Sequence, residues 1–389
     1  MDLHKLLVAN RGEIAIRVGR GAAELGLHTV AVYSTDDAES LHTRNADEAF
    51  DLGAEGARAY LDMDRILAIA ASSGCDAIHP GYGFLSENEE FARRCQAAGI
   101  RFVGPRPEIL ALFGNKVRAR ELAEHAGVPV LRGSPEAVTL DQARAFFESL
   151  GPGKGMMLKA VAGGGGRGTR AVESLEELES AYNRCRSEAL AAFGNGDVYA
   201  EQLVRQARHI EVQVIGDGTG AVSHLWEREC SLQRRYQKIV EFAPAPGLPG
   251  GLRQRITAAA VRAAEAAKYD NLGTFEFLVD ATAISDDSDF YFIEANARLQ
   301  VEHTVTEEIL GLDLVRIQLE LASGRSLADI GLLQANVPSP RGYAMQARVN
   351  MERMEADGST RPAGGTLTAL EVPSGPGLGT DTFRHAGYT

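Results

Sequence analysis

Short apolar runs and amphipathic stretches alternate along residues 1–115. Runs such as "KLLVAN" and "HTVAVYS" have the length of buried strands, whereas residues 12–25 place Ile14, Val18 and Ala22 on one face of a helix. The runs "CDAIHPG" and "IRFVG" continue the same alternation. Strands separated by helices of this length predict a parallel, doubly wound α/β sheet.

The pattern changes after a helical connector at residues 115–131. There "GMMLKAVAGGGGRGTRAV" predicts two strands joined by a glycine-rich loop, followed by a helix and the strand "VYAEQLV". Together these form an α+β unit of a size that suits a separate mobile domain. Further on, "HIEVQVIGDGTGAVSHLWERE" predicts a hairpin with "GDGTG" as its turn, and two more strands follow an alanine-rich helix at residues 253–268.

Four consecutive glycines at residues 163–166 need a reason, because glycine loses more conformational freedom on folding than any other residue. A dinucleotide fingerprint matches weakly, since the chain continues extended after Gly168 instead of opening a helix, and a Walker A loop would need lysine where Thr169 stands. The favoured interpretation is a hairpin that closes over a nucleotide and offers backbone N–H groups to phosphate oxygens, with Lys159 and Arg167 adding positive charge. The alternative, a flexible linker, fits poorly because the flanking residues are apolar.

Polar residues occupy every second position of "EANARLQVEH". The set is Glu294, Asn296, Arg298, Gln300 and Glu302. A strand sends alternate side chains to opposite faces, so the segment predicts one polar face, and Glu276 is likewise a single acid between two phenylalanines. Two carboxylates and an amide suit Mg²⁺ that carries nucleotide phosphates, while Arg298 would hold an anionic substrate and Glu302 would act as a base. An exposed strand without a function is the alternative.

Acidic residues outnumber basic ones by 53 to 40, and this balance argues against a nucleic-acid or anionic-membrane surface. The four cysteines include no CxxC pair, which predicts reduced, packed thiols instead of a zinc site or a disulfide framework. The sequence shows neither a signal-peptide core nor an apolar run of the length that a membrane span needs. We therefore expect a soluble, cytoplasmic protein.

Seven segments of the chain, taken in order, resemble biotin carboxylase, an ATP-grasp enzyme. They are "ANRGEIAIR" (9–17), "HPGYGFLSEN" (79–88), "GNK" (114–116), "LKAVAGGGGRG" (158–168), "ERECSLQRRYQK" (227–238), "FIEANARLQVEH" (292–303) and "ARVN" (347–350). The resemblance implies a ligase that uses ATP, Mg²⁺ or Mn²⁺ and bicarbonate to form carboxyphosphate, and then carboxylates biotin at its ureido nitrogen.

The resemblance also implies roles for the residues at matching positions. Phosphate-binding residues would be Lys116, Lys159, Gly163, Gly164, Gly165 and Gly166. Adenine would lie against Glu201, Gln202, Leu203 and Val204, with His209, Gln233 and Tyr236 near the nucleotide. The metal would bind Glu276 and Glu294, with Asn296 supporting, and bicarbonate would bind Lys238, Arg298, Gln300 and Val301. Glu302 would deprotonate bicarbonate, Arg348 would stabilise the biotin enolate, and Tyr82 would contact biotin. Cys230 also lies in a matching segment, and a packing role is favoured for it over a catalytic thiol.

The implied organisation is an N-terminal doubly wound domain at 1–115, an ATP-grasp domain at 116–330 with its lid at 132–203, and a partial C-terminal biotin carboxylase domain at 331–389. The chain stops short of the family's usual end. The implied partners are a biotin carboxyl carrier domain and a carboxyltransferase. The resemblance is also compatible with a homodimer or higher oligomer.

Three residues depart from the family's pattern: Tyr236 replaces a histidine, Thr169 a methionine and Thr304 a proline. Two other functions stay open. One is a truncated nucleotide-binding module with a structural or regulatory role, and the other is a carbamoyl-phosphate-synthetase-like ligase that uses ammonia.

Overall fold

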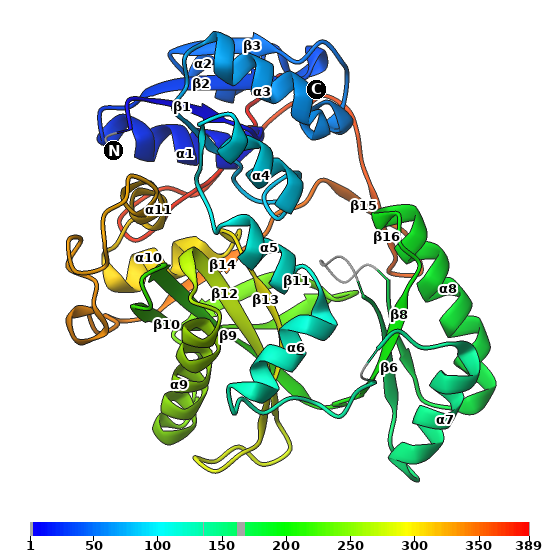
Figure 1. The fold of residues 1–389 in the computed structure, drawn as a ribbon. Helices are drawn as coiled ribbons and strands as arrows, with labels where there is room; N and C mark the ends of the chain where they lie inside the picture. The colour runs from blue at the N-terminus through cyan, green and yellow to red at the C-terminus, as the bar shows by residue number, and fades with distance from the viewer. Residues whose placement is uncertain (1–2, 135, 162–167, 389) are drawn as a thin grey trace. The chain divides into compact units, whose positions relative to one another are not determined.

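The computed structural model describes residues 3–134, 136–161 and 168–388. The chain divides into two compact units, which are coloured by residue number in Figure 1. Unit 1 comprises Met1–Gly104, Asp313–Gly324 and Ala347–Thr389, and unit 2 comprises Pro105–Leu312 and Arg325–Gln346. The division into three domains stays a prediction. In the part of the chain that the structure describes, no helix combines the length and apolar character needed to cross a membrane.

Unit 1 contains a five-stranded sheet of order β3-β2-β1-β4-β5, in which every pair of neighbours is parallel. Its strands are β1 (Lys5–Val8), β2 (His28–Tyr33), β3 (Glu48–Asp51), β4 (Ala77–His79) and β5 (Arg101–Phe102). The helices of this unit are α1 (Gly12–Glu24), α2 (Leu41–Arg44), α3 (Met63–Ser72), α4 (Glu89–Ala97) and α11 (Leu314–Ala322). Leu6, Leu7 and Val8 of β1 are buried, as a strand covered on both faces requires. The predicted doubly wound sheet is confirmed.

The larger sheet of unit 2 has the order β13-β12-β9-β10-β11-β14. Its strands are β9 (Ala207–Asp217), β10 (Val222–Arg234), β11 (Gln237–Ala243), β12 (Asp270–Asp280), β13 (Phe290–Asn296) and β14 (Ala344–Ala347). Four helices pack against it: α5 (Pro107–Phe113), α6 (Lys116–His125), α9 (Gly250–Ala266) and α10 (His303–Leu310). The β9–β10 pair is the hairpin predicted from "GDGTG", and a bulge interrupts it between His224 and Glu227.

The β10–β11 hairpin has the tightest turn in this sheet. Arg234 pairs with Gln237, so only Arg235 and Tyr236 form the turn, and both have positive φ angles, +53° and +62°. Positive φ at both central residues is the geometry of a type I′ turn, which normally uses asparagine and glycine. Two bulky side chains in this conformation store backbone strain next to Gln233 and Lys238, which the hairpin carries.

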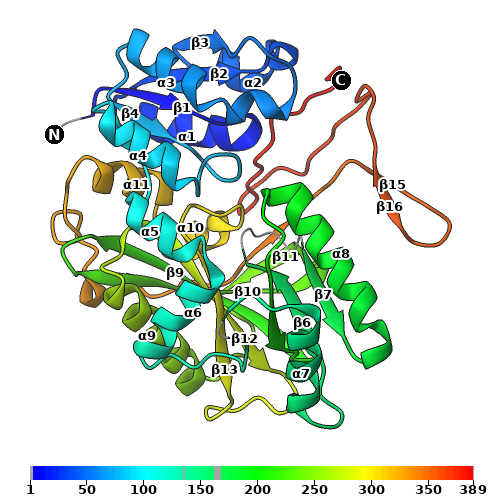
Figure 2. The same ribbon diagram turned by 45° about the vertical axis from the view of Figure 1, so that its right-hand side comes forward.

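A smaller three-stranded antiparallel sheet of order β7-β6-β8 lies within residues 132–203, the segment predicted to be a lid, and its role as a lid stays a prediction. It consists of β6 (Met156–Ala160), β7 (Thr169–Val172), β8 (Val198–Gln202) and the helices α7 (Leu140–Leu150) and α8 (Leu175–Phe193). Both helices cover the same face of this sheet (Figure 2), and the buried side chains between them form a separate core around Leu158 and Leu178. Thr139 and Ser174 form capping boxes at the N-termini of α7 and α8.

Two short crossings connect the lid to the rest of unit 2. Val130 bridges to Phe292 of β13, whereas Gly133 bridges to Glu201 of β8, so the chain enters the lid between them. It leaves between Leu203, whose N–H donates to Gly155 of the lid, and Ala207, where β9 begins. Each crossing is therefore only a few residues long.

Candidate active site

A row of three glutamates crosses the centre of the larger sheet. Glu276 of β12 lies directly opposite Glu211 of β9 on one side and opposite Glu294 of β13 on the other. Like charges at opposed positions of neighbouring strands repel one another, so this row needs cations close by. On the far side of Glu211, the register of β10 supplies one of them, Arg228.

Lys238 supplies the second cation, and it reaches the row from β11. Its ammonium donates to Glu211 Oε2 at 2.5 Å, Glu302 Oε1 at 2.7 Å and Glu276 Oε1 at 2.9 Å, and to the amide oxygen of Gln300 at 3.2 Å. Burial alone would lower the pKa of Lys238, but the surrounding carboxylates outweigh it and raise the pKa well above its usual range. Lys238 therefore stays charged and draws three carboxylates to one point.

Glu276 contacts Asn296 and His209 in addition to Lys238. Asn296 Nδ2 donates to its Oε1 at 2.7 Å, and His209 Nε2 lies 2.8 Å from its Oε2 in a close contact without regular hydrogen-bond alignment. Burial would raise the pKa of Glu276, but Lys238 and His209 outweigh it and hold the pKa well below its usual range. Glu276 is therefore an ionised carboxylate.

Gln233 orients the ring of His209. Its Nε2 amide donates to the carbonyl of Cys230 at 2.8 Å and contacts His209 Nδ1 at 3.0 Å. Because an amide NH₂ group only donates, Nδ1 is the acceptor and the ring proton lies on Nε2, which faces Glu276. The thiol of Cys230 is buried, and burial raises its pKa well above the usual range, as expected for packing.

The predicted polar strand at residues 294–302 is wrong beyond Asn296, where β13 ends. The N–H of Arg298 bonds back to the carbonyl of Asn296 at 2.9 Å, and α10 begins at His303, so the segment turns away from the sheet. The turn nevertheless brings Gln300 and Glu302 to Lys238, and Arg298 donates to Asn296 Oδ1 at 3.1 Å. The side chains converge, although they do not share one strand face.

Two lysines that we expect to bind phosphate each lie beside a glutamate. Lys159 Nζ donates to Glu201 Oε2 at 2.5 Å, and Lys116 Nζ lies 3.3 Å from Glu294 Oε2. Burial opposes the charge on Lys159, but Glu201 and Tyr199 outweigh it and raise the pKa of this lysine. Gly163, Gly164, Gly165 and Gly166 lie outside the described residues.

The remaining candidates belong to several different elements of the chain. Gln202 ends β8 and Leu203 and Val204 follow it, Val301 precedes α10, and Tyr236 is exposed in the hairpin turn. Tyr82 and Arg348 belong to unit 1. There the Tyr82 hydroxyl donates to Glu13 Oε1 at 2.7 Å, and burial together with Glu13 raises the pKa of the phenol.

A divalent cation fits the facing pair Glu276 and Glu294, because opposed carboxylates on neighbouring strands are hard oxygen ligands. Asn296 turns its Nδ2 toward Glu276, so its amide oxygen would have to rotate to join them. Among the described residues, the compact groups of three ligand-type side chains are His209 with Glu211 and Glu276, and Glu211 with Cys230 and Glu302. Glu276 is therefore a candidate metal ligand both in the pair with Glu294 and in the group with His209 and Glu211.

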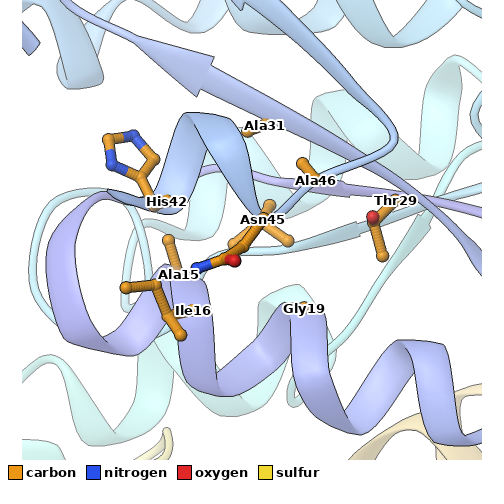
Figure 3. Close-up of a pocket in the computed structure, with 9 residues that line it drawn as sticks. Ala15, Ile16, Gly19, Thr29, Ala31, His42, Asn45 and Ala46 are labelled. Atoms are coloured by element: carbon orange, nitrogen blue, oxygen red, sulfur yellow. The ribbon is translucent and has the colours of Figure 1, made fainter. Parts of the chain in front are cut away.

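Sequence reasoning assigned no role to Glu211 and Arg228. Glu211 is a single acid among apolar residues in "HIEVQV", the same signal that singled out Glu276. Arg228 lies inside the matching segment 227–238 and is completely buried. A small hollow in unit 1 is lined mainly by small side chains and by His42 and Asn45 (Figure 3), and none of the candidate residues lines it.

Known proteins resemble this chain along its whole length. Residues 2–110 match the family model described as biotin carboxylase, N-terminal domain, and residues 115–330 match the carbamoyl-phosphate synthase L chain, ATP binding domain. Mitochondrial pyruvate carboxylase of Mus musculus is 49% identical over 383 residues, which is 97% of this chain and 32% of that protein. Pyruvate carboxylase of Bacillus subtilis is 49% identical over 390 residues, or 98% of this chain and 33% of that protein. The chain thus spans about a third of these relatives.

Solved structures of biotin carboxylases also resemble this chain. The biotin carboxylase domain dimer of Hydrogenobacter thermophilus 2-oxoglutarate carboxylase, in complex with MgADP, ADP and bicarbonate, is 41% identical with a TM-score of 0.93, and the match covers 100% of this chain and 83% of that chain. A biotin carboxylase–beta-gamma-ATP complex from Campylobacter jejuni is 39% identical with a TM-score of 0.92, covering 100% of this chain and 84% of that one.

Proposed function

Because the chain belongs to the biotin carboxylase family of ATP-grasp proteins, we propose that it carboxylates biotin on a carrier domain with ATP and bicarbonate, through carboxyphosphate. The observation that carries this proposal is the convergence of Glu211, Glu276 and Glu302 on Lys238. A half-buried ammonium can hold a small anion, and a carboxylate of a separate segment beside it can accept the anion's proton.

Bicarbonate would bind to Lys238 and Arg298, with Gln300 and the backbone of Val301 completing the site. Glu302 is the proposed general base, and its Oε1 already lies 2.7 Å from the Lys238 ammonium, so an anion held by Lys238 would lie beside it. Loss of the proton leaves an oxygen nucleophile for the γ-phosphoryl group of ATP, and ADP departs.

The nucleotide would take the place of existing ion pairs. Lys116 and Lys159, which contact Glu294 and Glu201, would turn to the phosphates, and the glycines 163–166 would close over them. Residues Glu201–Val204, with His209, Gln233 and Tyr236, would surround the base and ribose. Mg²⁺ or Mn²⁺, held by Glu276 and Glu294 with Asn296 supporting, would neutralise phosphate charge when bound.

The second half of the reaction concerns biotin. Arg348 would stabilise negative charge on the ureido oxygen, and Tyr82 would contact the biotin ring. We also propose that the partners are a biotin carboxyl carrier domain and a carboxyltransferase of an acyl-CoA or pyruvate carboxylase, that the protein forms a homodimer or higher oligomer, and that it works in the cytoplasm.

The test is ATP cleavage by the purified chain with bicarbonate, with ammonium and with neither, followed by transfer of labelled bicarbonate to free biotin. We expect cleavage that depends on bicarbonate and yields carboxybiotin. Nucleotide binding without bicarbonate-dependent cleavage would favour a structural or regulatory module, and dependence on ammonium would favour a carbamoyl-phosphate-type ligase.

A further inference from the structure

Arg228 is a completely buried arginine beneath the candidate site, and the reaction proposed above gives it no task. Its Nε donates to Glu211 Oε1 at 2.5 Å and its guanidinium also contacts Gln213 Oε1 at 2.8 Å. Two hydroxyls complete its surroundings, Thr306 Oγ1 at 2.9 Å and Thr274 Oγ1 at 3.2 Å. Neutralising Glu211 needs only a positive charge, whereas four contacts in fixed directions use the planar geometry that distinguishes arginine from lysine.

Glu211 transmits this geometry to Lys238. The carboxylate is completely buried, and its two oxygens are divided between the two cations, Oε1 to Arg228 and Oε2 to Lys238. Because the two oxygens of a carboxylate are rigidly connected, holding one of them restricts where the other can lie. The contact of Arg228 with Oε1 thereby restricts the position of the Oε2 atom that contacts Lys238.

The contact with Thr306 extends the same control to the base. Thr306 lies on the first turn of α10, and Glu302 is the residue that immediately precedes this helix. Arg228 thus contacts the helix that follows Glu302 and, through Glu211, the lysine that contacts Glu302.

We propose that Arg228 is a positioning residue that aligns Lys238 with Glu302, the pair that would receive bicarbonate. The inference rests on the proposed function. It predicts that the directional contacts of Arg228 matter for the rate, and that its charge matters mainly for the fold.

Arg228→Lys keeps the positive charge and removes the planar guanidinium group with its several N–H donors. Because an error of about 1 Å in position can cost about 10²-fold in rate, we expect bicarbonate-dependent ATP cleavage to fall about 10- to 100-fold in kcat, with a raised KM for bicarbonate and a KM for ATP within about 3-fold of the parent. Thr306→Val removes a single contact at nearly constant volume, and we expect a smaller change in the same direction.

Arg253→Lys is the matched control. Arg253 Nε donates to Glu227 Oε1 at 2.7 Å, and Glu227 is buried, but this pair does not contact Lys238 or Glu302. We expect its kinetics to equal those of the parent. If Arg228→Lys retains the parent's kcat and bicarbonate KM, charge alone suffices and the proposal is wrong. If Arg228→Lys does not fold, unchanged kinetics of Thr306→Val refute it instead.

A measurement without turnover separates this inference from the proposed function. The rate at which an amine-specific acylating reagent modifies Lys238, read from the mass of its fragment, should rise in Arg228→Lys and Thr306→Val and stay unchanged in Arg253→Lys. Faster modification together with a parent chain that lacks bicarbonate-dependent cleavage would support the positioning of Lys238 and refute the proposed reaction. Equal modification in all four proteins would refute the positioning.

Discussion

Acidification should destabilise unit 2 through one histidine that lies outside the candidate site. His224 is half-buried at the bulge in β10, its Nδ1 accepts from the N–H of Trp226 at 3.2 Å, and its ring packs edge-on against Trp226 at 5.7 Å. Burial lowers the pKa of His224 from 6.5 to about 4. A proton on Nδ1 would also face the Trp226 N–H, so the folded chain favours the neutral ring.

The sign and size of the effect follow from the two pKa values. The folded pKa lies below the unfolded one, so the stability is complete above about pH 6.5 and is lost as the pH falls toward 4. Between pH 7.5 and 5.0 the free energy of unfolding should fall by about 2 kcal/mol. For a domain of this size that corresponds to about 4–8 °C in Tm. Glu276 does not contribute in this window, because its depressed pKa places its loss below about pH 4.5.

Trp226 provides the assay, since it is the only tryptophan in the sequence and it lies beside His224. Thermal unfolding followed by its fluorescence at pH 7.5 and 5.0 compares the parent with His224→Asn, whose amide oxygen can still accept from the backbone. The pH-dependent loss should shrink by about 2 kcal/mol in this variant and persist in His125→Asn, a change at an exposed histidine. An undiminished loss in His224→Asn would refute the reasoning.

Four further predictions concern the proposed reaction. Glu276→Gln combined with Glu294→Gln should abolish Mg²⁺-dependent ATP turnover without unfolding the chain, because neutral amides bind a hard dication poorly, and full turnover would show that the metal site is misplaced. Glu302→Gln should slow bicarbonate-dependent ATP cleavage by about 10²–10⁴-fold. Arg348→Ala should instead slow biotin carboxylation by about 10²–10³-fold while ATP cleavage continues, and the reverse pattern would contradict both roles. MgATP should slow hydrogen exchange in the strands of the lid at 132–203, and equal exchange with and without nucleotide would remove the lid assignment.

The sequence predicted those parts of the fold in which local pattern and final structure agree. The strand and helix periods of residues 1–115 and the turn "GDGTG" are local signals, and the structure follows them. The end of β13 was missed because apolar and polar residues continue to alternate through residue 302, although the backbone turns at Arg298. Alternation records which side chains are buried, and a turn can bury alternate residues as a strand does.

The pairing of Arg228 with Glu211 could not be predicted from the hairpin alone. Val222 pairs with Gly216 near the turn, and the same register continued without interruption would place Arg228 opposite Ile210. The bulge between His224 and Glu227 shifts the pairing by one residue and places Arg228 opposite Glu211. Trp226, within the bulge, has a φ of +62°, which no sequence pattern indicates for tryptophan. The pairing of Arg228 with Glu211 therefore depends on this bulge.

The two crossings of the lid have a consequence for how such a protein can change through evolution. The N–H of Gln202 donates to the carbonyl of Arg132 at 2.8 Å, so the chain leaves and rejoins the larger sheet at one place. A segment with neighbouring ends can be inserted, deleted or exchanged without cutting any strand of the domain that carries it. The larger sheet, which carries Lys238, Glu211, Glu276 and Glu294, thus has its strands outside the segment between Arg132 and Gln202. Replacing that segment with a short glycine linker should therefore leave the larger sheet folded.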